Sequence, residues 1–363
     1  MKKILILSNH FITIYNFRKE LINELINKGH KVYISLPSSE QNDYFTKIGC
    51  EIIETKVDRR GLNPLKDLSL IVRYIKIMKE IKPDVVFSYT IKPNIYGSIA
   101  SRITGNKQIN NVTGTGATFV NKGLISSIAK ALYRMTFVNT YKVFFQNSGD
   151  KDFFVKNNMV RNNYSVIPGS GVNLQEFKIE EMDETNGITF IYIGRIMKIK
   201  GIEEFLECAK QIKQKYPKVK FLVAGFVEEE KYEEILKDYT SKGYIEYIGF
   251  QKDIRRWIKS STCTILPSHA GEGVPNVLLE TSACARICIA SDINGSQDVV
   301  EHTKTGFLFE AGNVTQLKTQ VEKVIQLNLK ERRDMGLAGR KRIEENYDRN
   351  FVIDRYVKEV DSL

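Results

Sequence analysis

Short runs of β-branched and aromatic residues alternate with longer amphipathic stretches along the whole sequence. The runs have the length of strands, and the stretches between them repeat apolar residues with the period of a helix. Chains with repeated strand–helix–strand order form parallel sheets with right-handed crossovers and helices on both faces. The sequence therefore predicts an α/β protein.

The alternation falls into two series. In the first, we expect strands at 4–8, 31–36, 84–89, 109–113 and 142–146, and helices at 15–28, 64–81, 93–105 and 124–139. In the second, we expect strands at 188–194, 220–225, 245–249, 263–267, 287–291 and 306–309, and helices at 201–215, 229–242, 277–285 and 314–327. A chain of 363 residues is long enough for two domains. We predict two Rossmann-like domains, 1–168 and 169–346, facing each other across a cleft, with a C-terminal helix in 347–363 packed back on the first.

Composition excludes several classes of protein. Hydrophobic residues make up 42% and charged residues 27% of the chain, which is typical of a globular protein. No run approaches 18 apolar residues, and the apolar run at the start is too short for a signal peptide, so we expect a cytoplasmic protein. The five cysteines and four histidines are scattered, so we expect neither disulfides nor a metal site.

The net charge of +11 is unevenly distributed. Residues 1–168 hold 25 Lys and Arg against 12 Asp and Glu, whereas the remainder holds 29 against 31. Residues 85–149 contain seven basic residues and no acidic one. Such a field attracts polyanions: nucleic acid, phosphorylated small molecules or an anionic membrane face. The apolar residues of 124–137, together with Lys122, Lys130 and Arg134, could form a helix at a membrane interface or an ordinary internal amphipathic helix.

Two basic residues follow the first strand of the second series. Gly194 allows a tight turn at the strand end, and Arg195 and Lys200 then lie at the start of the next helix. Ligands of doubly wound sheets bind at the carboxyl ends of strands, so the two cations could hold a diphosphate. Basic residues near strand ends are also common without a ligand, and the pair alone leaves both interpretations open.

Two glutamates follow the strand at 263–267. Glu272 lies in the loop and Glu280 one to two turns inside the next helix, with Gly273 and Pro275 between them. A loop carboxylate could reach a sugar ring, and a helical one could accept hydrogen bonds from ribose hydroxyls. Alternatively, Glu272 is an acid favoured by the helix dipole and Glu280 is a solvated residue.

Taken together, these features resemble the retaining glycosyltransferases of family 4, which have the GT-B architecture. The resemblance covers nearly the whole chain. It rests on the cation pair, the Glu-x7-Glu loop and four further motifs: Val166-Ile167-Pro168-Gly169-Ser170-Gly171-Val172-Asn173 with Phe177, Val223-Ala224-Gly225, Gly249-Phe250, and Leu266-Pro267-Ser268. In the first domain, Thr90-Ile91-Lys92-Pro93-Asn94-Ile95-Tyr96-Gly97 and Val112-Thr113-Gly114-Thr115-Gly116 are similar to the acceptor domain of bacterial enzymes that build capsule, O-antigen or lipid-linked glycans.

The resemblance implies roles for particular residues. It assigns catalysis to Arg195, Lys200 and Glu272. It assigns donor binding to Gly194, Gly225, Phe250, Ser268, Gly273, Pro275, Asn276, Val277 and Glu280. Candidates for acceptor binding are Asn16, Arg18, Arg59, Arg60, Lys92 and Thr115, although surface arginines without a ligand are an equal alternative. The histidine that some members place after the fourth strand is missing, so we assign no catalytic histidine.

The predicted function is transfer of a sugar, an N-acetylhexosamine or related hexose, from a UDP-sugar to a glycan on a polyprenyl diphosphate, with retention of configuration. Two cations can stabilise the departing diphosphate, so no cofactor and no metal are expected. We expect peripheral association with the anionic inner membrane surface. A UDP-sugar epimerase of the same architecture is the first alternative. A basic nucleic-acid-binding protein is a remote one, because no nucleic-acid-binding motif is present and we expect no nucleic acid as a partner.

Overall fold

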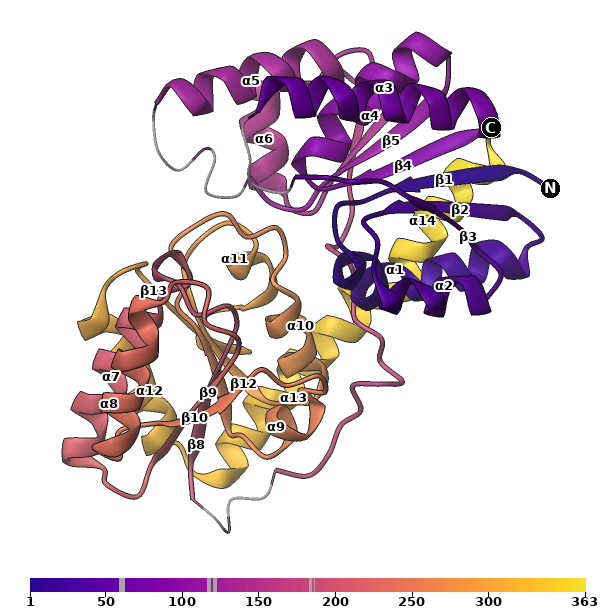
Figure 1. The fold of residues 1–363 in the computed structure, drawn as a ribbon. Coiled ribbons are helices and arrows are strands. Elements are labelled where there is room, and N and C mark those ends of the chain that lie inside the picture. The colour runs from indigo at the N-terminus through magenta and orange to yellow at the C-terminus, as the bar shows by residue number, and fades with distance from the viewer. Residues whose placement is uncertain (59–62, 116–118, 120–122, 183–184, 186) are drawn as a thin grey trace. The chain divides into compact units, whose positions relative to one another are not determined.

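The computed structural model describes residues 1–58, 63–115, 119, 123–182, 185 and 187–363. Contacts between residues divide the chain into two compact units (Figure 1). The first unit contains Met1–Ser170 together with Asn350–Leu363, and the second contains Gly171–Arg349. The chain therefore leaves the first unit two residues after the predicted domain boundary and returns to it for the last 14 residues.

The first unit is built on one parallel sheet. Its described strands are β1 (Lys3–Leu7), β2 (Lys31–Leu36), β3 (Glu51–Glu54), β4 (Val85–Tyr89), β5 (Lys107–Val112), β6 (Lys142–Phe145) and β7 (Tyr164–Val166), in the order β3-β2-β1-β4-β5-β6-β7. Its described helices are α1 (Phe11–Asn27), α2 (Asp43–Lys47), α3 (Pro64–Ile81), α4 (Ile91–Thr104), α5 (Leu124–Phe137), α6 (Ser148–Lys156) and α14 (Arg349–Asp361), with a 3-10 turn at Glu40–Asn42. The strand order changes direction between β1 and β4, which is where such sheets bind ligands.

Helices cover both faces of this sheet because alternate strand residues point to opposite sides. In β1, Ile4 and Ile6 pack with α1, α2 and α14, while Leu5 and Leu7 pack with α3 and α4. Farther along the sheet, α4, α5 and α6 pack on β5 and β6 (Figure 1). The helices α3 to α6 therefore share one face of the sheet.

The last helix belongs to the first unit although the second unit precedes it in the chain. Tyr356 of α14 is fully buried, and its ring centroid lies 5.0 Å from those of Phe87 and Phe144. Val352 and Val360 of the same helix are also in this core. The apolar stripe of α14 thus joins the C-terminus to the sheet of the first unit.

The second unit has the same type of architecture. Its described strands are β8 (Thr189–Ile193), β9 (Lys220–Ala224), β10 (Glu246–Gly249), β11 (Cys263–Leu266), β12 (Ile287–Ser291) and β13 (Gly306–Phe309), in the order β10-β9-β8-β11-β12-β13 and all parallel. Its described helices are α7 (Ile202–Lys215), α8 (Lys231–Ser241), α9 (Arg255–Lys259), α10 (Asn276–Ala283), α11 (Ser296–Val299), α12 (Val314–Gln326) and α13 (Leu329–Asn346), with a 3-10 turn at Lys198–Lys200. The predicted pair of Rossmann-like sheets is confirmed.

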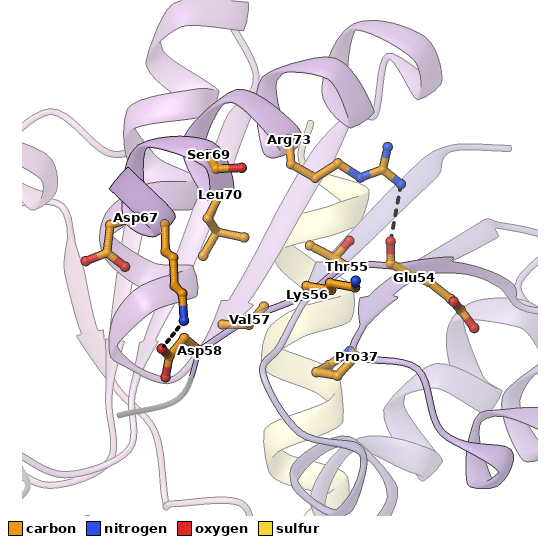
Figure 2. Close-up of a pocket in the computed structure, with 11 residues that line it drawn as sticks. Pro37, Glu54, Thr55, Lys56, Val57, Asp58, Asp67, Ser69, Leu70 and Arg73 are labelled. Carbon is orange, nitrogen blue, oxygen red and sulfur yellow. Dashed lines mark hydrogen bonds and ion pairs between the residues drawn. The ribbon is translucent and has the colours of Figure 1, made fainter. Parts of the chain in front are cut away.

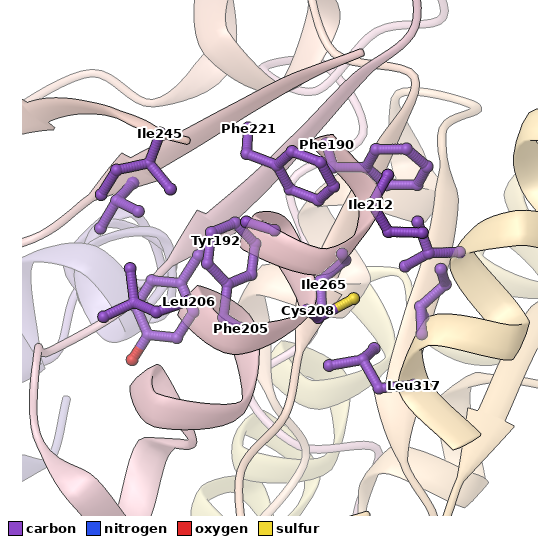
Figure 3. Packing of buried hydrophobic residues seen from close by; sticks show 14 of the residues in the cluster. Phe190, Tyr192, Phe205, Leu206, Cys208, Ile212, Phe221, Ile245, Ile265 and Leu317 are labelled. Atoms are coloured by element: carbon purple, nitrogen blue, oxygen red, sulfur yellow. The ribbon is translucent and has the colours of Figure 1, made fainter. Parts of the chain in front are cut away.

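The larger core of the second unit lies on one face of its sheet. Figure 3 shows aromatic and aliphatic side chains of the strands, such as Phe190 and Phe221, against α7. Helices α8 and α12 pack on the same core, while α9, α10 and α13 pack on the opposite face. Helices thus bury both faces of the sheet. The carboxyl ends of its strands, and the loops that follow β8 and β11, lie at one edge between the two layers of helices.

Candidate active site

The strand order of the second sheet changes direction between β8 and β11, which are hydrogen-bonded neighbours. The segment after β8 runs from Gly194 to Gly201 and the segment after β11 from Pro267 to Pro275. Seven of the twelve residues that the sequence assigns to catalysis or donor binding lie on these two segments. We call the second segment, residues 267–275, the donor loop.

The two segments are connected by an ion pair. The Lys200 ammonium lies 2.5 Å from Oε1 of Glu272, and both side chains are mostly buried. The Ser268 hydroxyl donates a hydrogen bond of 2.7 Å to the same oxygen. The structure therefore brings together a cation and a carboxylate that the sequence assigned to the diphosphate and the sugar.

Arg195 differs from Lys200 in having no partner for its charge. Its side chain is exposed and makes no hydrogen bond or ion pair with any other described residue. Its backbone carbonyl accepts a hydrogen bond of 2.8 Å from the Tyr192 hydroxyl, which fixes the turn. A guanidinium on a fixed backbone with free donors is suited to binding phosphate oxygens.

Glycine is required where the loops approach each other closely. A Cβ on Gly201, whose φ is +73°, would lie 1.9 Å from the carbonyl oxygen of Pro267. A Cβ on Gly225, whose φ is +154°, would lie 1.8 Å from the carbonyl oxygen of Gly194. Contacts of this length are impossible for a side chain, so both positions keep the carboxyl edge of the sheet compact.

Helix α10 carries the second glutamate. It begins at Asn276, directly after Pro275, and Val277 lies in its first turn. The Asn276 Oδ1 atom is buried without a hydrogen-bond partner among the described residues. The N-terminal N–H groups of a helix attract anions, which agrees with the donor-binding role that the resemblance implies for Asn276 and Val277.

Glu280 is half-buried on α10, and its carboxylate has no hydrogen bond or ion pair with another described residue. Burial raises its pKa to about 7, an effect that the charge of Arg349 opposes and that of Glu176 reinforces. Glu280 is therefore neither fully exposed nor fully buried, and its carboxylate reaches the surface of the unit. A partly buried carboxylate that bonds to no other described side chain has its lone pairs available for a ligand.

Two exposed phenylalanines flank the same edge. Phe250, predicted from the sequence, follows β10, and Phe226, which the sequence analysis missed, follows β9. They are 57% and 45% exposed, and their ring centroids lie 6.4 Å apart in an edge-on arrangement. The sequence could have indicated Phe226, because Phe226 and Phe250 each follow a glycine at the end of a predicted strand. Such a pair offers an apolar surface to a planar base.

No group of three or more His, Cys, Asp or Glu side chains that could hold a metal ion occurs among the described residues. The candidate site of the second unit therefore consists of two cations, two carboxylates, helix N–H groups and an aromatic pair.

In the first unit, the prediction that Arg18 contacts acceptor phosphates is wrong. Arg18 lies inside α1, which begins at Phe11, and is only 2% exposed. Its guanidinium carbon lies 4.8 Å from the centroid of the Tyr89 ring and 5.9 Å from that of Tyr356. The side chain is buried against aromatic rings of the core and does not face solvent.

The other acceptor candidates do not form one cluster. Lys92 is mostly buried and forms an ion pair of 2.7 Å with Asp67 of α3. Asn16 is exposed on α1, and Thr115 is half-buried after β5. Arg59 and Arg60 lie outside the described residues.

An open pocket of about 690 Å³ lies at the carboxyl ends of β2 and β3, beside the first turns of α3 (Figure 2). Its lining combines three cations and three carboxylates with apolar side chains: Pro37, Glu54, Thr55, Lys56, Val57, Asp58, Lys66, Asp67, Ser69, Leu70 and Arg73. Lys66 pairs with Asp58 at 3.4 Å, and Arg73 donates to the carbonyl of Glu54 at 3.2 Å. Mixed charges of this kind suit a ligand rich in hydroxyl groups.

A strained residue lies where the first sheet changes direction. Thr90 follows β4 with φ 75° and ψ 162°, a conformation that is essentially restricted to glycine. Its hydroxyl is buried and has no partner among the described residues. Strain of this kind is concentrated at functional sites, and no sequence pattern indicated it.

Two family models match the chain. Residues 3–147 match the model described as glycosyl transferase 4-like, and residues 175–342 match glycosyl transferases group 1. The two matches fall in the two structural units and together cover most of the sequence.

Several characterised proteins are similar over much of their length. The N,N'-diacetylbacillosaminyl-diphospho-undecaprenol alpha-1,3-N-acetylgalactosaminyltransferase of Campylobacter jejuni is 25% identical, covering 98% of each chain. The UDP-Gal:alpha-D-GlcNAc-diphosphoundecaprenol alpha-1,3-galactosyltransferase of Escherichia coli is 28% identical over 70% of each chain. The crystal structure of Anabaena HepE with UDP and glucose matches all of both chains with a TM-score of 0.82 at 16% identity, which shows a shared fold.

Proposed function

Because the chain is a glycosyltransferase that joins a 4-like N-terminal domain to a group 1 C-terminal domain, we propose that it transfers a hexose or N-acetylhexosamine from a UDP-sugar to a glycan on a polyprenyl diphosphate. One observation supports the part of this proposal that concerns the nucleotide-sugar donor. At the point where the second sheet changes direction, the unpaired cation Arg195 lies on the same short segment as Lys200, which is bound to Glu272. A departing nucleoside diphosphate needs cations at this place.

The same geometry gives each group a step in the reaction. When the bond between the sugar and the diphosphate breaks, negative charge grows on the diphosphate, and Arg195 and Lys200 stabilise it. Before this step, when the donor binds, Glu272 exchanges its bond with Lys200 for hydroxyl groups of the sugar, which frees Lys200 to contact the diphosphate. Because both carboxylates of this site are assigned to hydroxyl groups of the sugar and the ribose, we propose that a leaving phosphate oxygen takes the acceptor proton and that the acceptor attacks from the same face, with retention.

Binding of the nucleoside is assigned to the rest of the site. Glu280 accepts hydrogen bonds from the ribose hydroxyls, and the exposed rings of Phe226 and Phe250 contact the base. The relatives named above use or modify diphospho-undecaprenol-linked sugars, and one of them takes UDP-Gal. These names support a UDP-sugar donor and a lipid-linked acceptor for this chain. We place the acceptor sugar in the mixed-charge pocket beside α3.

A panel of nucleotides tests the donor assignment. UDP and UDP-sugars should raise the melting temperature of the protein more than GDP, ADP or CMP do, because a ligand that binds only the folded state stabilises it. A larger effect of GDP would contradict the uridine assignment.

Incubation of the protein with UDP-sugars in the absence of acceptor separates transfer from epimerisation. A transferase leaves the sugar of UDP-glucose or UDP-N-acetylglucosamine unchanged under these conditions. Thin-layer analysis that shows an interconverted UDP-sugar would favour the epimerase.

We further propose that no metal ion takes part, because two cations perform the electrostatic work. Turnover in excess EDTA should remain within twofold of turnover in Mg²⁺. A loss that Mg²⁺ or Mn²⁺ restores would show that the pair of side chains is insufficient.

We propose that the helical face formed by α3, α4 and α5 binds an anionic membrane. Helices α4 and α5 contain no acidic residue, and the three helices carry eight basic ones. Large apolar side chains are exposed beside them, including Leu65 at 78%, Leu68 at 58% and Ile128 at 51%. No described helix is long and apolar enough to cross a bilayer. An apolar surface among cations suits attachment to the headgroup region.

Reversal of charge on this face is expected to release the protein from vesicles. The exposed residues Lys76, Arg102 and Arg134 each contribute ~1 kcal/mol near an anionic surface, so the triple change to glutamate should weaken binding at least ~100-fold. The matched control changes Lys213, Lys237 and Lys242 of the second unit to glutamate. Sedimentation with phosphatidylglycerol vesicles at low salt is the measurement. Equal sedimentation of both triple variants, or of the wild type with neutral vesicles, would contradict the proposal.

A further inference from the structure

The donor loop contacts residues 198–204, which comprise the 3-10 turn before α7 and the first turn of α7. The Lys200–Glu272 ion pair is only one of these contacts. The backbone N–H of His269 donates to the carbonyl of Ile199 at 2.9 Å, and Gly201 lies directly against Pro267. Residues 198–204 and 267–272 therefore form one packed unit, although about 65 residues separate them in the sequence. Any group that fixes this packing also fixes the positions of Lys200 and Glu272.

A buried carboxylate makes the remaining connection. Oε1 of Glu204, in the first turn of α7, lies 2.9 Å from Nε2 of His269 in the donor loop. Glu204 is only 9% exposed, and its second oxygen has no partner among the described residues. One proton lies between these two atoms, and an ionised Glu204 would accept this hydrogen bond from Nε2 of His269.

Burial of the Glu204 carboxylate costs free energy, which suggests that this carboxylate has a function. A carboxylate taken out of water requires donors, and the described side chains give it one, the imidazole N–H. The positive end of α7 contributes favourable electrostatics in the first turn. The neighbouring Glu203, by contrast, is half-buried and bonds to Lys231 and the Tyr232 hydroxyl instead of a residue of the donor loop. Only one of the two adjacent acids is therefore directed toward the donor loop.

We propose that Glu204 and His269 are positioning residues that hold the donor loop so that Glu272 faces the transferred sugar and Lys200 the diphosphate. This inference rests on the proposed function. Neither residue touches reacting atoms in this account. The pair acts through the loop, so its loss should affect the positioning of the sugar more than the binding of the nucleotide, which depends on Glu280 and α10.

Turnover and nucleotide affinity of single variants provide the first test. Glu204→Ala and His269→Ala should each lower kcat about tenfold, the scale of one hydrogen bond to a charged group. The affinity for UDP should change less than threefold. His269→Gln, whose amide can donate the same bond, should recover at least half of the activity, and Glu203→Ala should behave as wild type. The double alanine variant should be no slower than the slower single variant, because both remove the same contact.

A second measurement does not depend on transfer activity. Hydrogen exchange of the amides in residues 268–274 should be about tenfold faster in Glu204→Ala than in wild type and unchanged in Glu203→Ala. If the wild type transfers no sugar while Glu204→Ala still exchanges faster than Glu203→Ala, the proposed function fails. In that case the inference that Glu204 and His269 hold the donor loop in place still stands. Unchanged kcat in both alanine variants, equal losses of kcat and UDP affinity, or fully additive effects in the double variant would overturn the inference.

Discussion

Replacement of Arg195 or Lys200 by alanine is expected to lower turnover at least ~100-fold, the scale of losing one preorganised partner for developing charge. The two variants should differ in a second property. Arg195 has no charged partner among the described residues, so its loss leaves the protein otherwise intact. Loss of Lys200 also leaves the mostly buried Glu272 without its cation, so Lys200→Ala should in addition unfold at a lower temperature.

Lys198→Ala is the matched control, since Lys198 is an exposed lysine of the same segment and is 4.0 Å from Glu203. It should keep wild-type turnover. Steady-state kinetics with saturating UDP-sugar separate an effect on the transfer step from an effect on donor binding. Undiminished turnover in both Arg195→Ala and Lys200→Ala would remove the diphosphate assignment.

Glu280→Gln is expected to have opposite effects on binding and stability. The carboxylate accepts charged hydrogen bonds from ribose, worth ~1.5–3 kcal/mol, so the affinity for UDP should fall roughly ten- to hundredfold. The unliganded variant should nevertheless be more stable than wild type at pH 8. The reason is that burial raises the pKa of Glu280 to about 7 from an ordinary value of 4.5.

Between pH 4.5 and pH 7 the folded protein binds more protons at Glu280 than the unfolded chain does. The free energy of unfolding therefore falls as pH rises from about 4.5 to 7. At about 1.4 kcal/mol for each pH unit between 4.5 and 7, the glutamine variant should gain up to about 3 kcal/mol at pH 8, and little at pH 4.5. Calorimetric titration with UDP and thermal unfolding at the two pH values are the measurements. Unchanged UDP affinity in a folded variant would contradict the ribose assignment, and equal stability at pH 8 would contradict burial of the charge.

The central strands were predictable because burial on both faces requires continuous apolar runs, as in Cys263–Leu266 and Ile287–Ser291. The edge strands were not. Glu51–Glu54 has two apolar residues between exposed acids, and Tyr164–Val166 has only three residues. Helix α13 was also missed because its polar residues hide the helical period, although Asn328 and Glu331 form a capping box at its start.

The proximity of the residues that follow β8 and β11 was predictable for a topological reason. The carboxyl ends of neighbouring parallel strands meet at one edge, so residues after β8 and β11 had to come together. The ion pair between Lys200 and Glu272 is the direct result.

The acceptor half was predicted poorly. A basic residue near the first strand looks available for phosphate in the sequence, but Arg18 points into the aromatic core and Lys92 is used by Asp67. Contacts such as Glu204 with His269, or the unusual backbone of Thr90, depend on three-dimensional packing that no local pattern records.

Sugar transfer itself tests the account most directly. The protein should be incubated with a UDP-sugar and a polyprenyl-diphosphate-linked saccharide, with UDP release and the mass of the lipid followed together. The account predicts that UDP appears in step with a lipid heavier by one hexose or N-acetylhexosamine, and that Arg195→Ala abolishes both signals. Release of UDP with free sugar and an unchanged lipid, across donors that bind, would contradict it.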